Sequence, residues 1–278
     1  MLTAFHPRNN LRAFAELTQL LTRHRQLTLE LARREIGERY AGQWFGTFWA
    51  IGHPLALILV YIFVFGFVFR TRIGGTTDLP LDYTAYMLSG LIPWLAFQES
   101  MGKASTVITS NANLVKQVIF PIEVLPIKGV IATLVTQCVF LVMLAVYALA
   151  TAQMLLWTYL LLPVLLVLQA LAMIGVSYSL AAIGAYFRDV KDFVQVFCSV
   201  AFFLLPILYL PEAVPSAVRP VLYVNPFSYL VWCYQDVLYF GRFEHPWAWC
   251  VFVPLSLFVF IIGYRIFRKL KPMFGNVL

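Results

Sequence analysis

The chain has 278 residues, of which 61% are hydrophobic and only 12% are charged. In soluble domains about a quarter of the residues are charged, so this composition excludes an ordinary soluble protein and indicates a membrane protein. The formal net charge of +7 does not indicate nucleic-acid binding, because the cations lie between and beyond long apolar runs, where they report membrane topology.

Residues 1–47 are predicted to form a cytoplasmic interface segment. Apolar residues recur at helical spacing from Leu11 to Ile36, and charged residues fall on the opposite side. This pattern is typical of an amphipathic helix on a membrane surface, and also of a solvated helix in a small soluble domain. Arginines within the same stretch, at Arg8, Arg12 and Arg23, argue against a cleavable signal peptide.

Residues 48–267 are predicted to form a six-span transmembrane domain, so the expected fold is an all-α integral membrane protein. A helix needs about 20 apolar residues to cross the hydrocarbon core, and the first run, Phe48–Phe69, carries no charge. The remaining runs are Tyr83 to about Ser105, Gly129–Ala150, Leu155–Tyr186, Phe193–Leu210 and Trp247–Phe267.

The second run is the weakest of the six because it contains two charges. Glu99 and Lys103 lie four residues apart with the glutamate first, the orientation that favours an ion pair on one helix. A charged pair at membrane depth is either a functional site or a self-neutralised structural pair, and the sequence favours the structural pair.

The distribution of basic residues predicts the orientation of the chain. In the six-span arrangement sixteen of the 20 Lys and Arg residues fall on one side, and the other side holds Arg70, Arg72, Arg219 and Arg242. Basic residues concentrate on the cytoplasmic side, so both termini are expected in the cytoplasm, with residues 268–278 forming a basic tail.

Residues 211–241 fit neither a solvated loop nor a span, because the segment is aromatic and apolar but broken by prolines. We expect short interfacial helices or a re-entrant hairpin on the outer side. The rings of this segment are interpreted either as an interfacial belt or as part of a gate. A disulfide between Cys233 and Cys250 is possible only if this region faces an oxidising compartment, and buried free thiols are the simpler expectation.

Motifs for catalysis and for cofactor or metal binding are missing from the sequence. It contains no GxxxxGK[ST], HExxH or GxSxG motif, and its four histidines and four cysteines are scattered. We therefore expect no cofactor, no metal and no ATPase site in this chain. Two loops on the cytoplasmic side, residues 110–128 and 186–193, are either charged turns or docking surfaces.

Four stretches resemble permease subunits of the ABC-2 type, in the branch that exports polysaccharides. They are "RYAGQWFGTFWAIGHPLALILVYIFVFGFVF" at the first span, "GLIPWLAFQES" followed by "NANLVKQVIFPIEVLPI", "FRDVKDF", and "NPFSYLVWCYQDVLYFG" near the outer side. Their order and spacing cover nearly the whole chain. Members of this branch often carry an arginine after the "NP" pair, where this chain has Gln235 and Asp236, so no role is transferred to that position.

The resemblance implies a homodimer in a bacterial inner membrane, partnered by two copies of a separate ATPase that binds ATP and Mg. It also implies an undecaprenyl-diphosphate-linked glycan, such as O-antigen, as the substrate. An ABC-2 exporter of drugs or small amphiphiles is the alternative within the family. A membrane-embedded transferase and a secondary transporter are the alternatives from other classes, but no acid–base constellation or internal repeat supports them.

Candidate site residues follow from placement and from the resemblance. Rings can hold a sliding sugar chain by stacking on its C–H faces, and they can equally face lipid. The channel-lining candidates are Tyr61, Phe65 and Phe69, which share one face, with Phe197 and Tyr209 as weaker ones. The cations Arg39, Arg33 and Arg34 are candidates for the lipid diphosphate, or for simple anchoring to the membrane. Candidates for contact with the ATPase are Asn113, Lys116, Phe120 and Glu123.

Overall fold

The computed structural model describes residues 22–40, 42, 44–68, 81–116, 120–153, 155–211 and 214–274. These residues form helices and contain no strand, which confirms the all-α prediction. The helices are α2 (Arg25–Tyr40), α3 (Trp49–Tyr61), α4 (Tyr83–Ala104), α5 (Val107–Ser110), α6 (Ala112–Val115), α7 (Val124–Ala152), α8 (Leu162–Gly184), α9 (Val190–Phe203), α10 (Pro220–Val224), α11 (Pro226–Gln235) and α12 (Pro246–Leu270).

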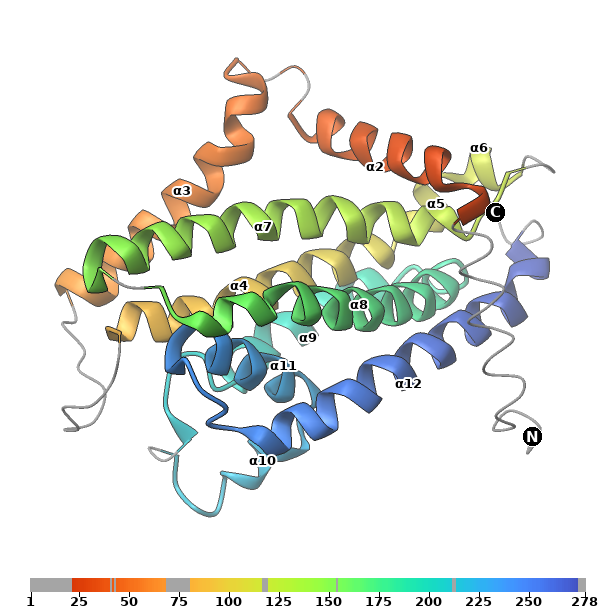
Figure 1. The fold of residues 1–278 in the computed structure, drawn as a ribbon. Coiled ribbons are helices and arrows are strands. Elements are labelled where there is room, and N and C mark those ends of the chain that lie inside the picture. Colours follow the sequence, from red (N-terminus) through yellow and green to blue (C-terminus); the bar gives the residue numbers. More distant parts are fainter. Residues whose placement is uncertain are drawn as a thin grey trace.

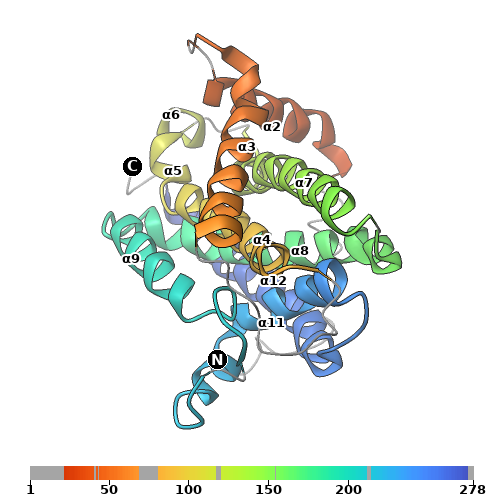
Figure 2. The same ribbon diagram turned by 90° about the vertical axis from the view of Figure 1, so that its left-hand side faces the viewer.

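The helices α4, α7, α8 and α12 run side by side and form the centre of the molecule (Figure 1). The view along this bundle places α9 on one flank and α7 on the other (Figure 2). One end of the bundle carries α5, α6 and the C-terminal end of α12, whereas α10 and α11 lie toward the opposite end (Figure 1). The surface helix α2 packs along α7, near the end that carries α5 and α6.

Within the described residues, four helical stretches are long and apolar enough to cross a membrane. They are Trp49–Gly66, Val124–Ala152, Trp157–Gly184 and Pro246–Met273. These stretches correspond to the first, third, fourth and sixth predicted runs. The helix of the third predicted run, α7, begins at Val124, whereas the run was expected to begin at Gly129. Pro126 falls in the first turn of α7, where its missing N–H costs no helical hydrogen bond, so the helix can include it.

The second and fifth predicted runs are not confirmed as spans. Helix α4 has 22 residues, which is long enough, but it carries Glu99 and Lys103. Helix α9 has only 14 residues and ends at Phe203 instead of Leu210. Proline at 206 disfavours the helical conformation of the residue before it, which explains the early end.

The chain after α9 is held by side chains from other helices. The carbonyl of Pro206 accepts hydrogen bonds from Tyr86 Oη of α4 at 3.2 Å and from Gln235 Nε2 of α11 at 2.8 Å. Buried main-chain carbonyls need partners, and these two donors supply them where the helix has ended.

Helices α8 and α12 cross with their backbones in contact. A Cβ atom added to Gly263 would lie 1.9 Å from the carbonyl oxygen of Gly175, and one added to Gly175 would lie 2.4 Å from the carbonyl oxygen of Val259. Small residues allow this close approach, which is a common means of helix association in membranes. Gly184 of α8 approaches the end of α4 in a similar way, since an added Cβ would lie 2.0 Å from the carbonyl oxygen of Ser105.

A polar network joins four helices inside the bundle. Gln137 of α7 and Gln169 of α8 exchange two amide hydrogen bonds, of 2.8 Å and 3.0 Å. Gln169 Nε2 also donates to the carbonyl of Pro93 in α4, and Tyr234 Oη of α11 donates to Gln169 Oε1. The network ties α11 to the centre of the bundle.

Residues 211–241, for which short interfacial helices or a re-entrant hairpin are expected, contain the short helices α10 and α11. Asn225 begins α11, because its side chain accepts a hydrogen bond from the N–H of Phe227 at 3.1 Å and Pro226 occupies the first turn. Helix α11 is buried against α4 and α12. Cys233 is buried and Cys250 is exposed, and both are free thiols.

The face that α2 presents to α7 matches the predicted apolar face only in part, because Ala32 belongs to that face but Thr28 does not. Thr28 and Ala32 are buried there, whereas Leu29 is 59% exposed. The part of the predicted amphipathic helix before residue 22 lies outside the described residues. Small and charged side chains of α2, Thr28, Ala32, Glu35 and Arg39, therefore take part in its contact with the bundle.

Candidate functional site

Five charged side chains from three helices form a continuous cluster between α2 and the bundle. Their order is Lys128, Glu35, Lys103, Glu99 and Arg39, with alternating sign. The N–O distances along this series are 3.1, 3.6, 3.0 and 3.1 Å. We call these five residues the charge cluster.

The charge cluster arises from two helical pairs with matching spacing. Helix α2 contributes Glu35 and Arg39, and α4 contributes Glu99 and Lys103, each pair four residues apart on one helical face. The glutamate of each helix meets the cation of the other, and Lys128 of α7 adds a second partner for Glu35. The predicted pair Glu99–Lys103 is present, at 3.0 Å, but as part of this larger group.

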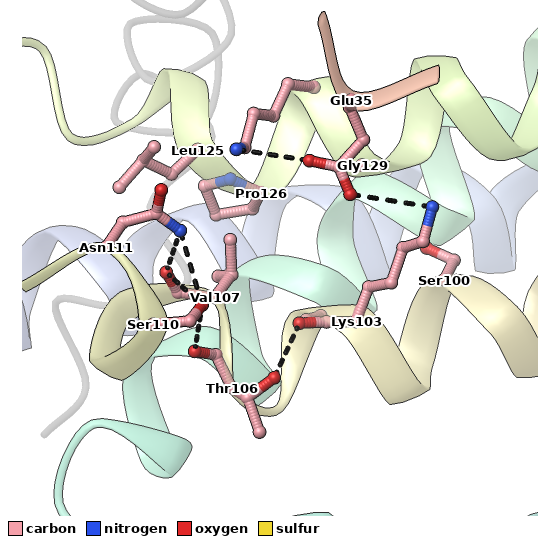
Figure 3. Close-up of a pocket in the computed structure, with 12 residues that line it drawn as sticks. Glu35, Ser100, Lys103, Thr106, Val107, Ser110, Asn111, Leu125, Pro126 and Gly129 are labelled. Atoms are coloured by element: carbon pink, nitrogen blue, oxygen red, sulfur yellow. Dashed lines mark hydrogen bonds and ion pairs between the residues drawn. The ribbon is translucent and has the colours of Figure 1, made fainter. Parts of the chain in front are cut away.

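A cleft of about 130 Å³ lies beside the charge cluster, at the end of the bundle that carries α5 and α6. Figure 3 shows Glu35 reaching from α2 to its cationic partners at the cleft. Ser110 and Asn111 on the opposite wall donate their hydrogen bonds to main-chain carbonyls. The ionic groups are therefore the strongest interaction partners that the cleft offers.

The three arginine candidates have different environments. Arg39 pairs with Glu99 and donates to Thr136 Oγ1 at 3.4 Å, and its side chain is 35% exposed. Arg34 pairs with Glu38 at 2.6 Å on the exposed face of α2, and Arg33 is exposed as well. The structure therefore brings only Arg39 into the charge cluster.

The aromatic candidates of the first span lie together. The rings of Tyr61 and Phe65 stack, with a distance of 6.2 Å between their centroids and an interplanar angle of 16°. Phe65 contacts Tyr83 at 5.7 Å, and Tyr83 in turn stacks on Tyr86. Tyr83 and Tyr86 extend the series onto α4, and the "YTAY" spacing at the start of that helix is the sequence signal for them. We call the four rings of Tyr61, Phe65, Tyr83 and Tyr86 the aromatic ladder.

The other aromatic candidates do not stack on the aromatic ladder in the described structure. Phe197 of α9 contacts Phe227 of α11 at 6.0 Å and is 39% exposed. The main-chain carbonyl of Tyr209 accepts a hydrogen bond from Tyr86 Oη of the ladder. Phe69 lies outside the described residues.

The candidates for the ATPase contact divide into surface and interior residues. Asn113 and Lys116 are exposed at the end of the bundle, in and just after α6. Phe120 is partly buried in a hydrophobic cluster. Glu123 is 7% exposed and pairs with Lys271 at 2.6 Å, while its carbonyl accepts a hydrogen bond from Tyr178. Glu123 therefore fixes the C-terminal end of α12 to this loop.

A second buried carboxylate lies at the other end of the bundle. Asp236 follows α11, and its side chain is 1% exposed. Asp236 Oδ2 accepts hydrogen bonds from the His245 N–H at 3.1 Å and from Trp249 Nε1 at 3.0 Å, and Oδ1 lies 2.8 Å from His245 Nδ1. This carboxylate joins α11 to the start of α12, and no motif in the sequence identifies it.

Comparison with known proteins identifies the same family that the four sequence stretches resemble. A family model described as "ABC-2 type transporter" matches residues 26–239. The O-antigen export system permease protein RfbA of Myxococcus xanthus is 29% identical over 262 residues, which cover 94% of this chain and 98% of the relative. The RfbA protein of Klebsiella pneumoniae is 26% identical over 256 residues, covering 91% and 95%. The polysialic acid transport protein KpsM of Escherichia coli is 20% identical over 245 residues, covering 87% and 93%.

Proposed function

Because the chain belongs to the ABC-2 type transporter family, we propose that it is the permease subunit of an exporter that moves a lipid-linked polysaccharide across a bacterial inner membrane. The observation that carries this proposal is the similarity over almost the full length of relatives named for O-antigen export and polysialic acid transport. The helices that are long and apolar enough to span a membrane support it.

The proposed assembly is a homodimer with two copies of a separate ATPase. Family membership supports such a partner, and α6 with Asn113 and Lys116 offers an exposed contact for it. In the proposed topology α4 and α9 complete six crossings, and both termini lie in the cytoplasm. This orientation places α5, α6 and the C-terminal end of α12 on the ATPase side.

The substrate in this proposal is a glycan linked to an undecaprenyl diphosphate. Its head group is doubly anionic and meets cations at the cytoplasmic interface, where α2 carries Arg33, Arg34 and Arg39. The polymer that follows is polar but presents C–H faces, and the aromatic ladder supplies rings for weak stacking along a path outward. Weak contacts suit export because tight binding sites would stall a moving chain.

Depletion of the permease tests the proposed function directly. We expect cells without it to accumulate the lipid-linked glycan in the inner membrane, and surface glycan to fall below a tenth of the normal amount. A P-loop ATPase is expected to copurify with the permease. Vanadate, an inhibitor of ATP hydrolysis, is expected to stop transport. Normal surface glycan after depletion, together with efflux of a small amphiphile, would instead support the drug-exporter alternative.

Alanine substitution of two rings tests the aromatic ladder. We expect the double variant Tyr61→Ala and Phe65→Ala to reduce export of long chains about thirtyfold, because losing two stacking contacts of about 1 kcal/mol each, about 2 kcal/mol together, weakens passage past this wall. Surface glycan length is measured by gel electrophoresis, and the amount of assembled permease by immunoblot. The matched control is Phe63→Ala in the same helical segment, whose side chain is 60% exposed. Unchanged long-chain export in the double variant would remove these rings from the path.

A further inference from the structure

We propose that Arg39, Lys103 and Lys128 form a phosphate-binding site that Glu35 and Glu99 occupy in this structure as internal anions. The inference rests on the proposed function, which supplies a phosphate-bearing head group as the ligand. It also revises the position of that site. The cations come from α2, α4 and α7, whereas Arg33 and Arg34 remain on the outer face of α2.

The charges of the cluster are unequal in number. Three cations face two carboxylates, so one positive charge remains in excess. Each carboxylate also serves two cations, Glu35 between Lys103 and Lys128, and Glu99 between Lys103 and Arg39. A phosphate group carries up to two charges and several acceptor oxygens, so it matches a site built to hold several cations at once.

The ion pairs are also accessible to a ligand. The cleft of about 130 Å³ borders Glu35, Lys103 and Lys128, and a second hollow of about 40 Å³ borders Glu35, Lys103 and Arg39. The side chain of Lys128 is 12% exposed and that of Lys103 is 30% exposed. Both amines are therefore partly desolvated, which strengthens their attraction for an anion. Figure 3 shows Glu35 and Lys103 among the residues that line this cleft.

Occupation by a phosphate has a consequence for α2. Glu35 and Arg39 both lie on this helix, so a phosphate that replaces Glu35 removes the two pairs that Glu35 makes with Lys103 of α4 and Lys128 of α7 and leaves Arg39–Glu99 as the remaining link of the charge cluster to α2. Arg39 is the one residue of α2 that gains a partner from the same ligand. Binding of the head group and the position of α2 are therefore coupled through one set of ion pairs.

Removal of the internal anions tests this inference, because it changes the affinity in a direction that a purely structural role does not. The full chain is placed in phosphatidylcholine nanodiscs and titrated with farnesyl diphosphate, a short isoprenyl diphosphate, by thermophoresis. We expect Glu35→Gln and Glu99→Gln each to bind about fivefold more tightly, which corresponds to about 1 kcal/mol for one partly exposed ion pair. Lys103→Gln and Lys128→Gln are expected to bind about fivefold more weakly.

The matched control is Glu38→Gln. Glu38 lies on α2 less than one helical turn after Glu35, but it pairs with Arg34 outside the charge cluster. This variant is expected to bind as the unchanged protein does, and thermal unfolding verifies that every variant is folded. If Glu35→Gln and Glu99→Gln bind no more tightly than Glu38→Gln, the inference is wrong.

Two further ligands identify what the site recognises. Inorganic pyrophosphate binding as tightly as farnesyl diphosphate supports a site for the free phosphate group, whereas weaker binding supports a site for a lipid head group. Farnesol binding as tightly as farnesyl diphosphate would overturn the inference, because the phosphates would contribute nothing. These outcomes are separate from the proposed function, whose failure appears as normal surface glycan after depletion of the permease.

Discussion

Replacement of Gly263 by alanine is expected to lower the free energy of unfolding by at least about 3 kcal/mol, and to leave little folded permease in the membrane. The added Cβ would lie 1.9 Å from the carbonyl oxygen of Gly175, which is backbone and cannot rotate away. The two helices must then separate along their length, which disturbs far more packing than one methyl group does. Thermal unfolding and the monodisperse fraction after size-exclusion chromatography measure the effect.

The control for this substitution is Gly102→Ala on α4. An added Cβ there meets nothing within 4 Å. Alanine favours a helix over glycine by about 1 kcal/mol, so Gly102→Ala is expected to be neutral or slightly stabilising. The same gain at Gly263 would show that α8 and α12 do not cross in backbone contact. Gly263→Ala is expected to lower the stability and Gly102→Ala to leave it unchanged or raise it slightly. A difference in expression level alone does not produce this contrast in unfolding temperature.

Replacement of Asp236 by alanine is expected to destabilise the protein by roughly 2–5 kcal/mol and to reduce export in proportion to the loss of folded permease. The substitution leaves the His245 N–H and Trp249 Nε1 without their acceptor, and each unpaired buried donor costs about 1–3 kcal/mol. The hydrogen bonds that Asp236 makes to the start of α12 are then lost, while the packing of α11 against α12 remains. Thermal unfolding in detergent and surface glycan per folded permease are the two measurements.

Glu244→Ala provides the matched control for Asp236→Ala. Glu244 pairs with Arg242 at 2.7 Å, but its side chain is 39% exposed and that of Arg242 is 73% exposed. Exposed ion pairs contribute about 0–1 kcal/mol, so this variant is expected to unfold close to the temperature of the unchanged protein. Equal losses in the two variants would mean that Asp236 acts only as another surface charge.

The parts of the fold that could be predicted are those set by local pattern. Long apolar runs predicted α3, α7, α8 and α12, because crossing a membrane requires apolar length in one stretch. The "NPFSY" stretch combines a capping asparagine with a first-turn proline, and α11 begins there. The end of α9 at Phe203 was missed because the run stays apolar to Leu210, and apolar composition does not distinguish a helix from a turn packed against protein.

The charge cluster shows what sequence pattern could not supply. The spacing of Glu99 and Lys103 predicted one pair, and the same spacing recurs at Glu35 and Arg39 on α2. The match between the two pairs depends on the register of α2 against α4, and Lys128 joins from a third helix. Register between helices that are distant in sequence is a tertiary property, so neither Glu35 nor Lys128 was identified before the structure.

The early end of α9 determines where main-chain polar groups lie within the proposed six-span arrangement. The carbonyls of Pro206 and Leu208 accept hydrogen bonds from Gln235 Nε2 and Tyr83 Oη, so this non-helical chain is satisfied by protein rather than by water. Unpaired carbonyls in hydrocarbon cost several kcal/mol, which means that this stretch can reach membrane depth only while α4 and α11 stay beside it. Any motion that opens a passage here must carry these three segments together as one rigid unit.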